Sequence, residues 1–135
     1  MAIRYLLDTN IFIYIRQRRP PGVLARFEAL QAGVTGMSVV SYGELQYGAE
    51  RSRNPGTAFK ALEEFAELIQ VLPLPASAGR TYAQIRRSLE IGGQIIGAND
   101  LWIAAHARAA ELTLVTNNER EFKRVAGLKI ENWTK

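Results

Sequence analysis

Short apolar segments alternate with helical segments along the whole chain, and this alternation constrains the fold more than any other feature. The apolar segments have the length of buried strands, whereas the segments between them repeat apolar residues every three or four positions. Parallel strands need crossovers of this kind, so the pattern predicts an α/β fold with a central parallel sheet between helices. The expected strands are residues 3–7, 34–37, 70–73, 112–115 and 128–130, and the expected helices are 11–17, 23–31, 38–52, 55–69, 75–91, 101–110 and 119–125.

Length and composition exclude several classes of protein. The 135 residues suit one domain, which we expect to span residues 1–135. The chain has no Cys, which excludes a disulfide scaffold, a thiol nucleophile and a Cys-bound metal. No apolar segment approaches the roughly 18 residues of a membrane span and no secretory signal is present, so we expect a cytoplasmic protein with no membrane partner.

The net charge of +4 is compatible with binding to nucleic acid. Most of the basic side chains are Arg, whose planar fork can bind two phosphate oxygens at once. Arginines on solvated helix faces would give the same balance, so the charge alone does not identify a partner.

Three acidic residues lie where strands meet helices. Asp8 directly follows the first strand, Glu44 lies in the first turns of the helix after the second, and Asp100 begins the helix before the fourth. Ligands of open α/β sheets bind at the carboxyl ends of strands, so we expect these carboxylates to meet in one crevice. Each acid also has a local explanation: Asp8 as a helix N-cap, Glu44 as part of a capping box that starts at Ser41, and Asp100 as a charge favoured at a helix start.

Carboxylates that meet in one crevice require a counter-charge. Two of them about 4 Å apart repel by roughly 4 kcal/mol at an effective dielectric constant near 20. Oxygen ligands without Cys select a hard cation, so we expect Mg²⁺ or Mn²⁺ in preference to Zn²⁺. His106, the only histidine, lies in the middle of an expected helix and is interpreted as a structural or surface residue.

Four motifs in register and a C-terminal tail resemble the PIN domain, and more narrowly the VapC-type toxins of bacterial toxin–antitoxin pairs. The matching segments cover nearly the whole chain: 6–10 (LLDTN), 41–49 (SYGELQYGA), 99–107 (NDLWIAAHA), 115–122 (VTNNEREF) and 126–133 (AGLKIENW). The resemblance implies a three-layer αβα sandwich with a central parallel sheet of about four or five strands. It also implies a Mg²⁺- or Mn²⁺-dependent endoribonuclease that cleaves structured RNA such as tRNA, with initiator tRNA as the target by analogy. The implied partners are a VapB-type antitoxin and a second copy of the chain, within a higher-order toxin–antitoxin complex.

The resemblance assigns roles by position. Asp8 and Asp100 match direct metal ligands, and Glu44 matches a ligand or a group that orients the attacking water. Many PIN domains carry a fourth acid after the fourth strand, where this chain has Asn118, and either Glu119 or Glu121 is an alternative. The secondary candidates are Asn10, Thr116, Asn118 and Glu121, with Thr116 expected to orient the loop and support the metal ligands. The candidates for contacts with the RNA backbone are Arg86, Arg87, Arg120 and Lys123.

Two other functions compete with this interpretation. A phosphatase with Asp8 as covalent nucleophile would need a second Asp two residues later, where the chain has Asn10. A catalytically inactive PIN fold that binds RNA or an antitoxin is the other alternative, and the missing fourth acid is its motivation.

Overall fold

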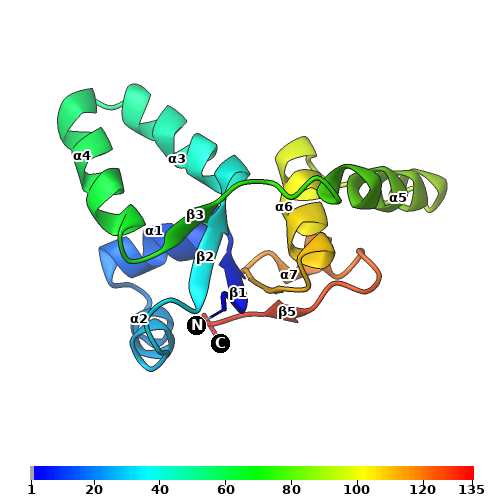
Figure 1. Cartoon of the computed structure of the whole chain (residues 1–135), viewed down its shortest axis with the longest axis horizontal. Coiled ribbons are helices and arrows are strands. Elements are labelled where there is room, and N and C mark those ends of the chain that lie inside the picture. Colours follow the sequence, from blue (N-terminus) through cyan, green and yellow to red (C-terminus); the bar gives the residue numbers. More distant parts are fainter. Residues whose placement is uncertain (1) are drawn as a thin grey trace.

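A five-stranded, all-parallel sheet in the order β3-β2-β1-β4-β5 forms the centre of the computed structural model, which describes residues 2–135 (Figure 1). Tyr5 in the central strand lies opposite Thr35 on one side and Thr113 on the other. The strands are β1 (Tyr5–Leu7), β2 (Thr35–Ser38), β3 (Gln70–Leu72), β4 (Thr113–Val115) and β5 (Ile130–Glu131). The prediction of an α/β fold with a parallel central sheet is confirmed.

The order of the strands reverses at β1, and this reversal marks where a ligand would bind. From β1 the chain adds β2 and then β3 on one side, whereas β4 and β5 lie on the other side. The carboxyl ends of β1 and β4 therefore lie side by side at a topological switch point. Asp8 follows β1 at this point and Thr116 follows β4.

Helices cover both faces of the sheet, as Figure 1 shows. They are α1 (Thr9–Gln17), α2 (Pro21–Glu28), α3 (Val39–Glu50), α4 (Pro55–Ala66), α5 (Ala78–Ile91), α6 (Ala98–Ala109) and α7 (Glu119–Phe122). In Figure 1, α1 to α4 lie to the left of the strands and α5 to α7 to the right. None of the helices described in residues 2–135 is long and apolar enough to cross a membrane.

Alternating residues of the strands divide the apolar interior into two cores, one on each face. In β1, Leu6 packs with residues of α5 to α7, whereas Leu7 packs with residues of α1 to α4. Both side chains are fully buried, and each such burial stabilises the fold by about 1.5–3 kcal/mol. The two-residue period of a strand thus fixes the side of the sheet on which each helix lies.

Helix starts differ from the sequence prediction where a polar or proline residue precedes the helix. The helix expected at 11–17 begins at Thr9, because the Asp8 side chain caps it. The helix expected at 23–31 begins at Pro21, because proline fits the first turn of a helix and does not break it there. The helix expected from residue 101 begins at Ala98, which places Asp100 inside its first turn.

Other boundaries move by a few residues without changing the element order. The helix expected at 75–91 begins at Ala78, and those expected at 55–69 and 119–125 end at Ala66 and Phe122. The last strand, expected at 128–130, is Ile130–Glu131.

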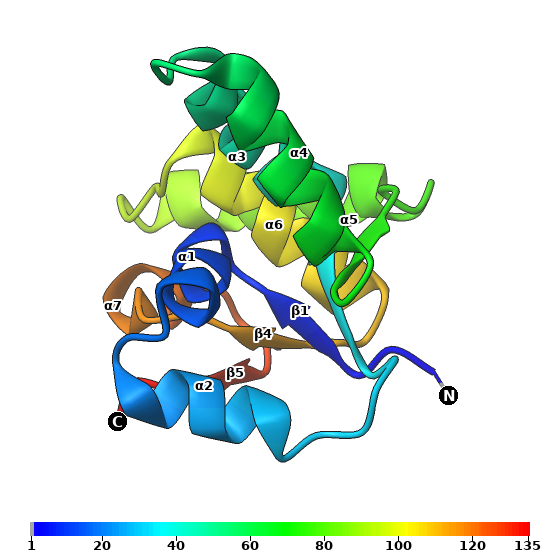
Figure 2. The same cartoon turned by 90° about the vertical axis from the view of Figure 1, so that its left-hand side faces the viewer.

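The C-terminal tail closes the sheet edge against α2, beside β5 (Figure 2). Arg26 Nη2 and Trp133 Nε1 both donate to Glu131 Oε1, each at 3.0 Å. The Trp133 ring is buried and meets the Tyr5 ring edge to face, with ring centres 5.7 Å apart. The tail therefore belongs to the core that contains Leu7 and the residues of α1 to α4.

Candidate active site

Asp8 lies at the switch point of the sheet with both carboxylate oxygens held. Oδ1 accepts from Thr9 N and Oδ2 accepts from Thr116 Oγ1, each at 2.8 Å. The residue is 6% exposed. Burial raises the pKa of Asp8 above its ordinary value, the bonds from Thr116 and Thr9 lower it, and the charge of Glu44 raises it. The sequence left open whether Asp8 is a helix N-cap or a residue of the crevice. In the structure Asp8 both caps α1 and lines the pocket.

Thr116 connects Asp8 to the loop after β4. Its buried hydroxyl donates to Asp8 and accepts from Asn118 N at 2.9 Å. Thr116 thus orders this loop and fixes the orientation of the Asp8 carboxylate, as the resemblance implied.

Glu44 projects from α3 toward the same pocket, and it is not a helix cap. The capping box expected at Ser41–Glu44 is wrong, because α3 begins at Val39 and is capped by Ser38, whose Oγ accepts from Val40 N at 3.2 Å. Glu44 Oε1 accepts instead from Thr9 Oγ1 at 2.8 Å. This bond joins α3 to the start of α1 across the mouth of the pocket.

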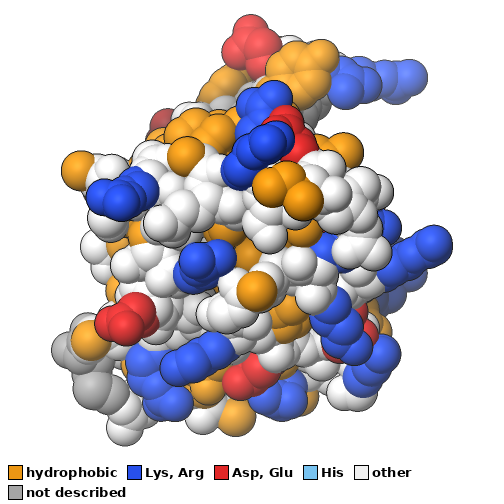
Figure 3. Space-filling view, turned by 90° about the vertical axis from the view of Figure 1, so that its right-hand side faces the viewer, with side chains coloured by type: hydrophobic (Ala, Val, Ile, Leu, Met, Phe, Trp, Pro, Cys, Tyr) orange, Lys and Arg blue, Asp and Glu red, His pale blue; other side chains and the backbone are white. Residues whose placement is uncertain are grey.

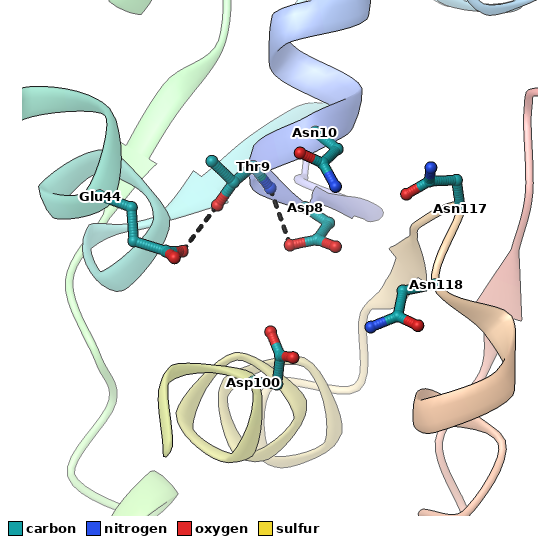
Figure 4. A pocket seen from close by; sticks show the side chains of 7 residues that line it. All are labelled: Asp8, Thr9, Asn10, Glu44, Asp100, Asn117 and Asn118. Atoms are coloured by element: carbon teal, nitrogen blue, oxygen red, sulfur yellow. Dashed lines mark hydrogen bonds between the residues drawn. The ribbon is translucent and has the colours of Figure 1, made fainter. Parts of the chain in front are cut away.

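Asp100 faces Asp8 from the first turn of α6, as Figure 4 shows. Burial raises the pKa of Asp100 to about 7, and the nearby charges of Asp8, Glu121 and Glu44 add to this effect. Burial and the neighbouring acids thus both disfavour the charged form of Asp100, and a bound cation would stabilise that form.

The fourth acid next to this site is Glu121, not Glu119. Glu121 accepts from Asn118 Nδ2 at 3.1 Å and lies close enough to Asp100 to raise its pKa. Glu119 turns away and pairs with Lys135 Nζ at 2.7 Å. Asn118 itself lines the pocket, and its amide holds Glu121 beside it.

The three predicted acids line one pocket of about 390 Å³, together with Thr9, Asn10, Asn117 and Asn118 (Figure 4). Every polar side-chain group that faces it is a carboxylate, amide or hydroxyl, which is the donor set that Mg²⁺ and Mn²⁺ prefer. Within residues 2–135, no group of three or more acidic or histidine side chains is arranged to bind a metal ion by itself. Mg²⁺ does not need one, since it keeps several waters and is bound by one or two carboxylates plus substrate phosphates.

His106 lies below this site and has a structural role, which agrees with its interpretation from sequence. The buried ring bonds to Ser38 through Nδ1 and Oγ, 2.8 Å apart. Since Ser38 also caps α3, the bond links α6, which carries Asp100, to the start of the helix that carries Glu44. Burial lowers the pKa of His106.

The four basic candidates differ in their surroundings. Arg86 and Arg87 are exposed on α5 and pair with Glu90 at 3.2 and 3.9 Å. Arg120 and Lys123 are exposed and form no ion pair within residues 2–135. On the face that carries α5 to α7, Lys and Arg side chains are scattered and do not form one continuous patch (Figure 3).

Sequence reasoning missed Asn117 and Tyr14. Asn117 lines the pocket, and its Nδ2 donates to the Tyr14 hydroxyl at 2.9 Å. Its place in the loop directly after β4 was a usable signal, but the contact with α1 depends on the pairing of β1 with β4.

Comparisons with known proteins agree with this arrangement. A model of the PIN domain matches residues 5–128. The chain is 42% identical over 131 residues to the ribonuclease VapC2 of Haemophilus influenzae, covering 97% of this chain and 98% of that protein. It is 42% identical over 132 residues to the tRNA(fMet)-specific endonuclease VapC of Shigella flexneri, covering 98% and 99%. The structure of VapBC-1 from nontypeable Haemophilus influenzae superposes with a TM-score of 0.91 and 37% identity over the full length of both chains.

Proposed function

The chain belongs to the PIN-domain family, within its VapC group, and on that basis we propose that it is a metal-dependent endoribonuclease that acts as the toxin of a toxin–antitoxin pair. The observation that carries this proposal is the convergence of Asp8, Glu44 and Asp100 on one pocket at the carboxyl edge of the sheet. Carboxylates that hold a divalent cation suit hydrolysis of a phosphodiester, because the cation offsets the charge of the phosphate and activates a water.

Mg²⁺ or Mn²⁺ is the proposed cofactor, held by Asp8 and Asp100. The raised pKa of about 7 at Asp100 supports this choice, because burial and the neighbouring acids both disfavour the charged carboxylate and a divalent cation would stabilise it. When bound, such an ion supplies Lewis-acid chemistry, which makes an attacking water more acidic and offsets the charge of the phosphate.

The remaining side chains position the water and the carboxylates. Glu44, held by Thr9 at 2.8 Å, orients the attacking water or completes the set of ligands. Glu121, held by Asn118, adds the fourth acid beside Asp100 and can accept the proton that the water releases. Thr116 keeps the Asp8 carboxylate turned into the pocket.

Arg120 and Lys123 are the proposed contacts to the RNA backbone. Both lie on or next to α7, which follows the pocket loop directly, and both are exposed. Arg86 and Arg87 remain secondary candidates, because their guanidinium groups already pair with Glu90. Such contacts would make RNA binding fall steeply as salt increases.

The proposed substrate is tRNA and the proposed partner is a VapB-type antitoxin. The substrate follows from the Shigella flexneri relative, which is named for tRNA(fMet), so initiator tRNA is the first target to test. The partner follows from the Haemophilus influenzae structure of VapBC-1. By the same reasoning we propose a homodimer that assembles with the antitoxin, and inhibition of translation in the cytoplasm as the outcome of cleavage.

The direct test is incubation of the purified chain with total tRNA and with initiator tRNA transcript, in Mg²⁺, in Mn²⁺ and in chelator. Asp8→Asn, Asp100→Asn and Glu121→Gln remove one acid each. The matched control is Glu119→Gln. Glu119 lies on the same helix as Glu121, but its side chain faces Lys135 and not the pocket.

The proposal predicts a discrete cut that requires metal, is lost in the first two variants, is weakened by Glu121→Gln and is kept by Glu119→Gln. Equal cutting with chelator or by the Asp variants would overturn the metal site. Binding of tRNA without any cut in Mn²⁺ would instead identify a binding module.

A further inference from the structure

Three amides line the pocket beside the acids, and the proposed reaction leaves two of them, Asn10 and Asn117, without a role. Asn10 lies in the first turn of α1, and Asn117 lies in the loop after β4. In Figure 4, Asn117 stands at the end of the view farthest from Glu44, and the Asn10 side chain is turned toward it.

Asn117 is held in one orientation by Tyr14. Its Nδ2 donates to the Tyr14 hydroxyl at 2.9 Å, and Tyr14 is half-buried on α1. The bond uses one N–H of the amide and turns the amide so that Oδ1 is left as an acceptor, since no donor contacts Oδ1 within residues 2–135. A preorganised acceptor loses little rotamer freedom when it binds a ligand.

The neighbouring amide, Asn118, also keeps its Oδ1 as an acceptor, but its Nδ2 donates to the acid Glu121 and its backbone N–H donates to Thr116, which holds Asp8. Asn118 is therefore tied to the acids of the proposed metal site, whereas Asn117 is tied to Tyr14. Asn10 makes no side-chain hydrogen bond in the described part of the chain, and its amide nitrogen faces the Asn117 oxygen in Figure 4.

An acceptor oxygen at the rim of this pocket selects a particular part of a nucleotide. It repels the non-bridging oxygens of the phosphate, which are acceptors too, so its partner is either the metal ion or a group that carries a hydrogen. In RNA these groups are the ribose 2′-hydroxyl, which both donates and accepts, and the amines of the bases. An acceptor at Asn117 opposite a donor at Asn10 is complementary to a hydroxyl.

We propose that Asn117, held by Tyr14, is a specificity-determining residue that accepts a hydrogen bond from the nucleotide at the scissile phosphate, through its 2′-hydroxyl or the amine of its base. This inference rests on the proposed ribonuclease function. Tyr14 is a positioning residue, because it acts through Asn117.

The test couples changes in the protein to changes in the RNA. The protein is the full chain with Asn117→Ala, Tyr14→Phe or the control Asn54→Ala, an exposed asparagine whose side chain caps nothing. The probes are tRNA stem–loops that span the cut, all-ribose, with single 2′-deoxy substitutions on either side of it, or with inosine or purine riboside in place of guanosine or adenosine. For each pair we would measure kcat and KM in Mg²⁺, and Kd by fluorescence anisotropy in EDTA.

The expected result is that Asn117→Ala lowers kcat/KM on the all-ribose substrate by about 10- to 100-fold. One modified probe should lower kcat/KM of the unchanged chain by a similar factor. The same probe should lower kcat/KM of Asn117→Ala no further, because two changes that remove the same direct contact are not additive. A 2′-deoxy probe identifies the ribose, whereas a base analogue identifies the amine. Tyr14→Phe should lose a smaller factor, about 2- to 5-fold, because the acceptor remains but is free to rotate. Asn54→Ala should change neither value.

Three results would overturn the inference. One is full activity of Asn117→Ala, and another is a loss of the same factor on every probe. A third is a loss that higher Mg²⁺ restores, which would make Asn117 a metal ligand. If the unchanged chain cuts no RNA, the proposed function fails, and the Kd values then decide this inference by the same coupling.

Discussion

Replacing Asp100 by Asn should stabilise the metal-free protein at alkaline pH. The folded chain holds a proton on Asp100 up to a pKa of about 7, compared with an ordinary value of 3.8. Between these two values the folded state binds more protons than the unfolded state, so the free energy of unfolding falls as pH rises. Asn cannot ionise, so Asp100→Asn removes this loss.

The size of the effect follows from burial. A pKa of about 7 in place of 3.8 corresponds to at most about 4 kcal/mol, at about 1.36 kcal/mol per pH unit. Asp100 is only half-buried and water screens its charge, so we expect a gain of about 1–2 kcal/mol at pH 8. For a domain of this size that is a rise in Tm of roughly 3–10 °C. At pH 4 the gain should be close to zero, because the carboxyl group is then protonated in the folded chain.

Circular dichroism melts in EDTA at pH 4, 5, 6, 7 and 8 measure the gain directly. Glu119→Gln is the control, because Lys135 lowers the pKa of Glu119 and its loss should act in the opposite direction. Mg²⁺ at ten times its Kd should raise the stability of the unchanged chain by about 1.4 kcal/mol and that of Asp100→Asn by less. A gain that is equal at pH 4 and pH 8, or a Tm at pH 8 below that of the unchanged chain, would refute the reasoning.

Three further substitutions test other contacts. Thr116→Val should cost about 1–3 kcal/mol in urea unfolding and raise the pKa of Asp8 further, whereas Thr116→Ser should restore both values; no difference between the two variants would count against the bond to Asp8. The lowered pKa of His106 makes the free energy of unfolding fall as pH drops below about 6.5. His106→Gln should therefore reduce the loss of stability between pH 7 and pH 5, and an equal fall in Tm for the variant and the unchanged chain over this range would contradict this. Trp133→Ala should cost about 3–5 kcal/mol in urea unfolding, and a cost under about 1 kcal/mol would show that the tail is not part of the core.

The local chemistry of the sequence was enough to predict the sheet and three of the acids. Parallel strands are buried on both faces, so they appear in the sequence as short apolar runs. An acid directly after such a run lies at the carboxyl edge of the sheet. Asp8 was therefore predicted from its position after the first strand, whereas Glu44 and Asp100 were predicted from their positions in the first turns of helices next to strands. Helix starts were harder, because Pro21 and Ala98 begin helices through backbone geometry that composition does not reveal.

The identity of the fourth acid depended on contacts between distant residues. Glu119 and Glu121 are two positions apart and equivalent by composition. Their contacts distinguish them: Glu119 pairs with Lys135 at the end of the chain, whereas Glu121 accepts a hydrogen bond from Asn118. The contact of Tyr14 with Asn117 is similar, since it exists only after β1 and β4 pair.

The pairing of β1 with β4 also sets the order of events on the ribosome. β1 is the first strand to leave the exit tunnel, but its neighbour begins at Thr113, and Leu7 pairs with Val115. Until those residues emerge, Thr116 cannot donate its hydrogen bond to Asp8, and Asn117 and Glu121 have not reached their positions beside the pocket. The pocket is therefore completed only after the loop that follows β4 has emerged.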